Sequence, residues 1–239
     1  ARLQQPLPEP AYKPLEEGQN SMLDANARLK RQRERRQAIE QLNYTWLSQM
    51  ATAREQLREK MTLFWHGHFA CLLREPGLMK LQNNTLRQHA LGNFPELLLA
   101  ISKDPGMLQF LNNQQNRKRS PNENFAREIM ELFTLGEGHY SETDLKEAAR
   151  SFTGWSVDAA NGAFRFRAAW HDGGGKTIFG RSGAFDGDEV IELLLARPET
   201  AELVVAKLWR QFVSEQPDPA AVKRLAVFFR DGGYEIKPL

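Results

Sequence analysis

The sequence predicts a mainly α-helical protein, built as a single-domain helical bundle-like array with one short β-hairpin insertion. Apolar residues recur at helical spacing along most of the chain, and capping residues, prolines and glycines separate the periodic stretches. Only one place, around Asn161-Gly162, has the dipeptide and flanking pattern of a tight hairpin. With 239 residues, of which 41% are hydrophobic, the chain is long enough for a sizeable core. We expect roughly seven to nine helices.

The N-terminal residues are expected to differ from the rest. Residues 1–18 contain several prolines and show no helical period, so we expect residues 1–20 to form an extended arm. Residues 21–239 are then predicted to form one helical domain.

Two long helices are expected next, over residues 24–51 and 52–73. The first begins with a run of charges between Arg28 and Arg36, which we interpret as a solvated helix face rather than a polyanion site, because no aromatic residue interrupts it. The second contains His66 and His68, which would point about 160° apart on an α-helix. Both could bind one metal ion only if Gly67 broke the helix, so the simpler interpretation of His68 is a hydrogen-bonded core histidine.

Pro76 and Gly77 are expected to end the second helix, and residues 83–101 to form the third, with Pro95 kinking or restarting it. A short helix is expected over residues 105–111. Residues 112–119 form a polar, basic loop, for which capping and turns are the simpler role and substrate binding the alternative.

The stretch from Ser120 to Gly138 is expected to be the helix around which the chain is organised. Ser120 fits the N-cap, Pro121 the first helical position and Glu123 the capping box. Two faces follow from a rotation of about 100° per residue. The buried face would hold Ala126, Ile129, Met130 and Phe133, and the polar face Asn124, Glu128 and Glu131.

The remaining chain is expected to return to helices after one hairpin. Helices are predicted over residues 141–152, 187–196, 198–213 and 218–230, and hairpin strands over residues 155–157 and 164–167. Residues 170–177 are predicted to form a glycine-rich loop that ends in Gly-Lys-Thr. It is not a phosphate-binding loop, because Trp170 stands where the first glycine belongs and no helix follows.

Composition excludes several kinds of function. The net charge of +2 gives no reason to expect nucleic acid as a partner. No apolar run is long enough to span a membrane, and the N-terminus lacks a signal-peptide pattern. Cys71 is the only cysteine, so an internal disulfide and a cysteine metal cluster are both excluded.

Five segments, in this order, carry a family resemblance: FWHGHFA from Phe64, NNTLRQHALGNF from Asn83, NRKRSPNENFAREIMELFTLGEGHYSE from Asn116, EAARSFTGW from Glu147 and HDGGGKTIFG from His171. On these motifs the chain resembles the bacterial domain-of-unknown-function family 1800. The resemblance implies a protein that is often exported, hence periplasmic or extracellular, and that continues beyond both ends of this chain. It also implies a neighbouring partner protein that is similar to alkaline phosphatases and sulfatases. It implies no reaction and does not decide whether the protein is an enzyme.

One functional hypothesis is an enzyme or metal site that uses polar residues from three of these segments. Its catalytic candidates are His66, Glu128, Glu131, His171 and Asp172, and its substrate-binding candidates are Asn124, Arg127 and Lys176. A divalent metal is the cofactor that these groups would suit, with His66, His68, Glu128 and Glu131 as its ligands.

The alternative hypothesis is a non-catalytic scaffold or binding module. In that case the same asparagine, glutamate and arginine side chains form a buried hydrogen-bond network that fixes the orientation of the helices. Capping and buried hydrogen bonding would account for Glu123 and Arg127 equally well.

Overall fold

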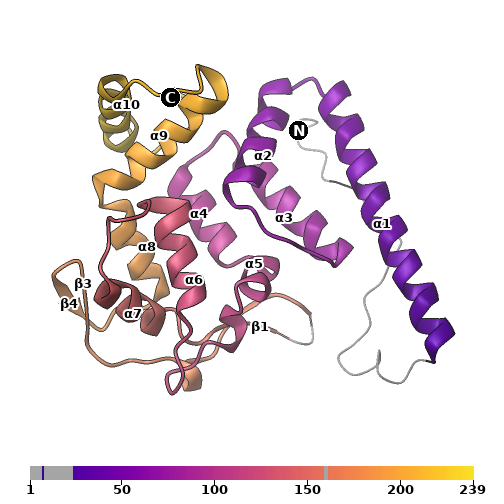
Figure 1. Ribbon diagram of the computed structural model, residues 1–239, viewed down its shortest axis with the longest axis horizontal. Coiled ribbons are helices and arrows are strands. Elements are labelled where there is room, and N and C mark those ends of the chain that lie inside the picture. Colours follow the sequence, from indigo (N-terminus) through magenta and orange to yellow (C-terminus); the bar gives the residue numbers. More distant parts are fainter. Residues whose placement is uncertain (1–6, 8–23, 159–160) are drawn as a thin grey trace. The chain divides into compact units, whose positions relative to one another are not determined.

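The computed structural model describes residue 7 and residues 24–158 and 161–239, which form two compact units, Ala1–Ala90 and Leu91–Leu239 (Figure 1). The extended arm expected over residues 1–20 lies, apart from Leu7, outside the described residues. The described part is mainly α-helical, as the sequence predicts, and its ten α-helices exceed the expected seven to nine. Each unit is described below by itself, and the expectation of one domain over residues 21–239 stays a prediction.

The described part of the first unit contains three helices, α1 (Ala25–Thr52), α2 (Gln56–His68) and α3 (Pro76–His89). The Asp24 side chain caps α1 by accepting a hydrogen bond from the Ala27 amide. The prediction for residues 52–73 was too long, because the helix occupies only the central part of that range. Pro76 and Gly77 begin α3 rather than ending α2, since proline suits the first helical turn, where its missing N–H costs no hydrogen bond.

A buried ion pair joins α2 to α3. Arg87 donates two hydrogen bonds to Glu59, from Nε to Oε1 at 2.8 Å and from Nη2 to Oε2 at 3.1 Å. Both side chains are almost completely buried, so each charge is stabilised by the opposite charge of its partner instead of by water. Nearby, the Trp65 indole donates to the Ala90 carbonyl at 3.0 Å, which satisfies its only polar group in the core.

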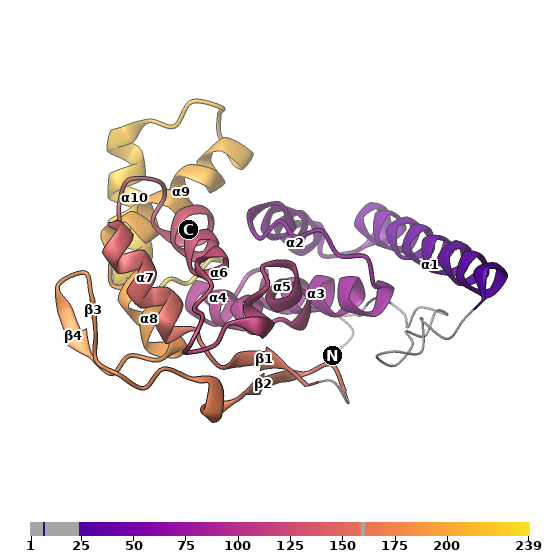
Figure 2. The ribbon, with the colours of Figure 1, turned by 60° about the horizontal axis from the view of Figure 1, so that its bottom comes forward.

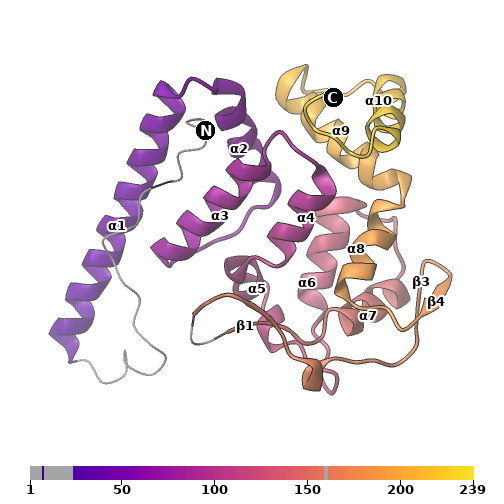
Figure 3. The ribbon, with the colours of Figure 1, turned by 180° about the vertical axis from the view of Figure 1, so that it is seen from behind.

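The second unit contains the other helices, several of which are visible from behind in Figure 3. They are α4 (Phe94–Ser102), α5 (Pro105–Phe110), α6 (Glu123–Glu128), α7 (Glu142–Ser151), α8 (Gly187–Leu195), α9 (Pro198–Phe212) and α10 (Pro219–Asp231), with short 3₁₀ turns η2 (Asn113–Gln115) and η4 (Ala168–Trp170). The caps predicted at Ser141 and Asp186 are both confirmed as capping boxes, with Asp144 and Glu189 respectively. The range predicted as one helix over residues 83–101 is divided, because residues 90–93 separate α3 from α4. The predicted restart at Pro95 is confirmed, since this proline lies in the first turn of α4.

The organising helix has the predicted faces but a different start and a different second half. Asn122, not Ser120, is the N-cap, and its side chain accepts from the Asn124 amide at 3.0 Å. After α6 the chain continues as a π-helix, η3 (Ile129–Thr134), whose wider turn leaves carbonyls that lack an α-helical donor. The Thr134 hydroxyl donates to the Ile129 carbonyl at 2.8 Å and so satisfies one of them. All four residues predicted on the apolar face are buried.

Two antiparallel hairpins, not one, occur in the described residues (Figure 2). The predicted hairpin is confirmed as β1 (Trp155–Val157) and β2 (Phe164–Phe166). The second, β3 (Lys176–Ile178) and β4 (Arg181–Gly183), corrects the expectation of a single hairpin. Its turn places Phe179 and Gly180 at positive φ, and a phenylalanine in that conformation gave no turn signal in the sequence.

None of the described helices has both the length and the apolar composition that crossing a membrane requires.

Candidate functional site

The predicted site residues fall into three groups, and the first is the acidic face of α6 and η3. Glu128 and Glu131 are half-buried on this face. Tyr140 donates its hydroxyl hydrogen to Glu131 Oε2 at 2.6 Å, whereas no described residue donates a hydrogen bond to the Glu128 carboxylate. Burial, and then the charge of Glu131, raise the pKa of Glu128 against the opposing effect of Arg127. Glu128 therefore holds a proton more readily than an ordinary glutamate.

Arg127 and Tyr140 complete this acidic face. The Arg127 guanidinium lies 3.4 Å from Glu123 and 3.6 Å from Glu142, so it is already shared between two carboxylates. Burial lowers its pKa, but Glu142 and Tyr140 raise it, and the net shift is upward. Burial and the bond to Glu131 raise the pKa of Tyr140 to about 12. The face thus combines a carboxyl that is easily protonated, a carboxylate held by a phenol and a fixed cation, which together suit acid–base chemistry.

Asn124 belongs instead to an asparagine network that holds the start of α6. Its side chain donates to the Leu111 carbonyl at 3.2 Å. Asn116 donates to the Ala149 carbonyl at 2.9 Å and accepts from the Asn122 amide at 2.9 Å. Asn113 donates to the Phe152 carbonyl at 3.3 Å. These bonds support the scaffold hypothesis for this motif, because they attach the loop before α6 to α7.

The second group is the loop that contains His171, Asp172 and Lys176. Asp172 accepts from Arg150 Nε at 2.8 Å and from Nη2 at 3.2 Å, and these bonds help to lower its pKa to about 2. The Lys176 ammonium is buried and donates to three carbonyls, those of Asp172, Gly174 and Phe185. Because an ammonium has three hydrogens, Lys176 has none left for a substrate in this conformation.

His171 has one ring nitrogen used by the fold. Its Nδ1 lies 2.9 Å from the Thr153 carbonyl, which can only accept, so Nδ1 carries the hydrogen. The Nε2 atom is then an acceptor with no hydrogen-bond partner among the described residues. His171 is therefore the residue of this loop whose side chain can still accept a hydrogen bond from a bound molecule.

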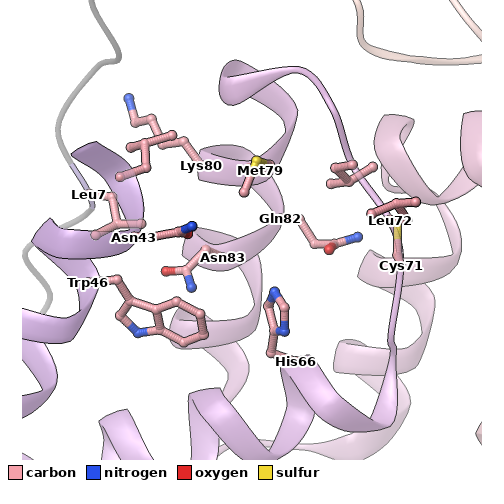
Figure 4. A pocket seen from close by; sticks show the side chains of 12 residues that line it. Leu7, Asn43, Trp46, His66, Cys71, Leu72, Met79, Lys80, Gln82 and Asn83 are labelled. Atoms are coloured by element: carbon pink, nitrogen blue, oxygen red, sulfur yellow. The ribbon is translucent and has the colours of Figure 1, made fainter. Parts of the chain in front are cut away.

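The third group is a pocket in the first unit, shown in Figure 4. It contains His66 from α2, Trp46 from α1 and Asn83 from α3, and its volume is about 150 Å³. The Trp46 and His66 rings lie 5.2 Å apart between centroids. Burial lowers the pKa of His66, so its imidazole is neutral at physiological pH.

The polar atoms of this pocket are incompletely bonded. Asn83 is only 4% exposed, and neither its Oδ1 nor its Nδ2 has a hydrogen-bond partner among the described residues. The Trp46 indole N–H is also buried without a partner there. Figure 4 shows the Asn83 amide between Trp46 and His66. Each such group costs about 1–3 kcal/mol unless something in the pocket bonds to it.

His68 lies apart from this pocket. It is buried beside the rings of Trp65 and Phe69, with centroid distances of 5.5 and 4.5 Å. Among the residues that the structure describes, no three His, Cys, Asp or Glu side chains are grouped to hold a metal ion. The four-ligand metal hypothesis therefore stays a prediction, with no cluster of described residues to support it.

The pocket and the acidic face include residues that the sequence analysis did not identify as functional. Trp46 lies inside the helix predicted over residues 24–51, Asn83 begins the helix predicted over residues 83–101, and Tyr140 was not singled out. Only Asn83 carried a usable signal, because it stands three residues before Leu86 on the buried side of its helix.

Fold and site together define a mainly helical protein with a small polar pocket in its first unit and an acidic, tyrosine-bonded face in its second. The family described as "Protein of unknown function (DUF1800)" matches residues 1–239, so the chain belongs to that family. No curated protein and no solved structure matches the chain.

Proposed function

We propose that this protein is a ligand-binding protein whose first unit holds a small polar molecule in the His66 pocket. The observation that carries the proposal is the buried amide of Asn83, for which no described residue supplies a hydrogen-bond partner. A fold that buries this amide without a partner sacrifices stability, and a bound molecule that bonds to it would recover that loss.

The chemistry of the lining indicates the class of ligand. Asn83 presents one acceptor and one donor, Trp46 presents a donor, and His66 is a neutral imidazole. Most of the other lining side chains are apolar, among them Leu7, Leu42 and Met79. Lys80 also lines the pocket, but Figure 4 shows its ammonium pointing away from Asn83 and His66. A small uncharged molecule with both donors and acceptors, such as a primary amide or a polyol, therefore fits this combination better than an ion. Without such a ligand, the pocket has room for on the order of ten water molecules.

The first test compares two neighbouring asparagines. Asn83→Leu removes the unpaired amide and should leave the free energy of unfolding unchanged or raise it by about 1–3 kcal/mol. Asn84→Leu is the matched control, because Asn84 Oδ1 accepts from the Leu7 amide at 2.9 Å and from Arg87 at 3.2 Å. The control should lower stability in urea denaturation. A clear loss of stability in Asn83→Leu would show that its amide is already bonded, and the proposal would fail.

The second test detects the ligand directly. In ¹⁵N NMR spectra the indole N–H signal of Trp46, assigned with Trp46→Phe, is followed while acetamide or glycerol is added. We expect this signal to move in the wild type and to stay in place in Asn83→Leu. If neither compound, nor any other small amide or polyol, moves it, the pocket holds water only.

Acid–base catalysis by the acidic face of α6 and η3 is a second candidate function. The observation in its favour is the half-buried Glu128 carboxyl, which receives no hydrogen bond from a described residue. It lies at the end of α6, directly before the π-helix η3, which carries Glu131, the hydrogen-bond partner of Tyr140. π-Helical turns occur often at functional sites. Glu128 would exchange a proton with the substrate, and Arg127 would hold an anionic group.

This candidate predicts a coupled titration. The ¹³C carboxyl signal of Glu128 should titrate above the usual glutamate range, and Glu131→Gln should move that midpoint down by removing the neighbouring charge. Because a raised pKa means that ionised Glu128 is less favourable in the fold than in the unfolded chain, Glu128→Gln should keep or raise stability at pH 7, whereas the exposed Glu137→Gln should change nothing. If Glu128 titrates within the usual range of a glutamate, the catalytic candidate is lost and the scaffold hypothesis remains for this face.

Metal binding, export and a phosphatase-like or sulfatase-like partner are the remaining parts of the hypothesis. Metal binding by Glu128 and Glu131 is tested by elemental analysis of the native protein and by its thermal shift with divalent ions and chelator. Export and the partner rest on the family resemblance, and cell fractionation and co-purification from the native host would test them.

A further inference from the structure

In the second unit, basic side chains are gathered around the ring of Trp170, and this cluster has no part in the proposed function. Trp170 ends η4, and two guanidinium groups lie over its ring, that of Arg117 at 3.9 Å and that of Arg167 at 4.6 Å from the centroid. Such contacts hold the planar guanidinium groups against the indole and direct their N–H groups outwards.

The backbone fixes this arrangement. Arg117 and Ser120 pair across a tight turn, in which the Ser120 amide donates to the Arg117 carbonyl at 2.8 Å. The Lys118 amide donates to the Trp170 carbonyl at 2.8 Å and so attaches the turn to η4. Between them lies a cavity of about 320 Å³, lined by Arg117, Lys118, Arg119, Ala169 and Trp170.

The cations around this cavity are uncompensated. Arg117, Lys118, Arg119 and Arg167 form no ion pair with any carboxylate of the described residues. Arg167 instead donates to the Ser156 hydroxyl at 3.3 Å. By contrast Arg165, two residues earlier on β2, lies 3.0 Å from Asp158. Three of these cations line the cavity, and the fourth, Arg167, lies against the Trp170 ring. Their charges repel each other, so an anion bound in the cavity would be stabilised by them.

We propose that this cavity binds a small ligand that carries at least two phosphate or sulfate groups. Guanidinium groups bind these oxyanions through pairs of parallel hydrogen bonds, and Lys118 adds a point charge. Two oxyanion groups are needed because one would neutralise only part of the charge of the three cations that line the cavity. A small ligand is favoured over a polymer because the cavity is bounded by one turn and one ring, and the whole chain is nearly neutral.

Isothermal titration calorimetry with pyrophosphate tests the proposal, with a sulfated disaccharide as the second probe. The test variant is Arg117→Gln/Arg119→Gln. Both side chains are exposed, and among the described residues their only side-chain contact is that of Arg117 with the Trp170 ring. The matched control is Arg165→Gln/Arg181→Gln, which removes the same charge from two exposed arginines on the hairpins. We expect pyrophosphate to bind the wild type with a Kd near or below ~1 mM, and the test variant to bind about tenfold more weakly. The control should stay within about twofold of the wild type.

The two probes also distinguish the source of the anion. Tighter binding of pyrophosphate assigns the site to phosphates and tighter binding of the disaccharide assigns it to sulfates, and either result supports the proposal. The proposal is overturned if neither probe binds, or if the control loses as much affinity as the test variant. It is also overturned if a single-stranded oligonucleotide binds and pyrophosphate does not displace it, because the surface then recognises a polymer.

Discussion

Neutralising Asp172 should remove a measurable, pH-dependent part of the stability. In the fold Asp172 accepts two hydrogen bonds from Arg150 and one from the Gly174 amide, and its pKa falls from 3.8 to about 2. A depressed carboxyl pKa adds stability above the unfolded pKa near 3.8, and this stability is lost as the pH falls through the folded value. The shift corresponds to about 2 kcal/mol at pH 7, of which roughly half is already lost at pH 3.

The assay is urea denaturation of wild type and Asp172→Asn between pH 3 and pH 7. Asparagine keeps the size of the side chain and imitates the protonated acid, so Asp172→Asn should be about 2 kcal/mol less stable at pH 7. The difference should shrink steadily towards pH 3. Asp158→Asn is the control, because Asp158 pairs with the exposed Arg165, and such surface pairs contribute about 1 kcal/mol or less.

Two results would refute this reasoning. Equal stability of Asp172→Asn and wild type at pH 7 would mean that the Arg150 pair contributes nothing. A loss that stays constant from pH 7 to pH 3 would mean that the cost comes from packing and not from the charge of Asp172.

Three further predictions concern the core and the helix geometry. Ile129→Ala and Phe133→Ala should each lower the free energy of unfolding by about 2–5 kcal/mol, because both side chains are buried; unchanged urea midpoints would contradict the assigned faces. Arg87→Ala should cost about 3–5 kcal/mol by leaving Glu59 buried without its cation, and a smaller loss in Glu59→Ala/Arg87→Ala than the sum of the single losses would confirm the coupling in a double-mutant cycle. Thr134→Val should cost about 1 kcal/mol through its lost bond to a π-helical carbonyl, and an unaltered thermal midpoint would speak against that role.

Much of the fold follows from local signals in the sequence. The helix starts at Ser141 and Asp186 and the hairpin around Asn161-Gly162 were predicted because their capping and turn residues act within a few positions. Pro76 was assigned to the wrong helix end, since proline is compatible with both the residue after one helix and the first turn of the next. The π-helix could not be predicted, because its residues have ordinary α-helical patterns and its geometry depends on tertiary contacts.

The candidate site was less predictable than the fold. Glu128, Glu131 and Arg127 were identified because they share a helix face. Tyr140 was missed since it reaches Glu131 from beyond a turn with two glycines, and sequence spacing does not encode that approach. The pocket partners Trp46 and Asn83 come from two helices, and their common location with His66 depends on how those helices pack. Lys176 was predicted to bind substrate, whereas its three bonds to backbone carbonyls could be seen only in the folded loop.

The π-helix η3 also bears on which changes in chain length the protein can accept. A turn closed from residue i to i+5 contains one residue more than an α-helical turn, so deleting one residue between 129 and 134 would allow a regular α-helix. Because the α-helical turn closes with one residue fewer, it would take up the missing residue, and the residues after the deletion would keep the sides that they now face. A deletion here should therefore be less damaging than one in a regular α-helix, where every later residue would be rotated by about 100°. Related chains are expected to differ in length by one residue more readily in this segment than in the regular helices.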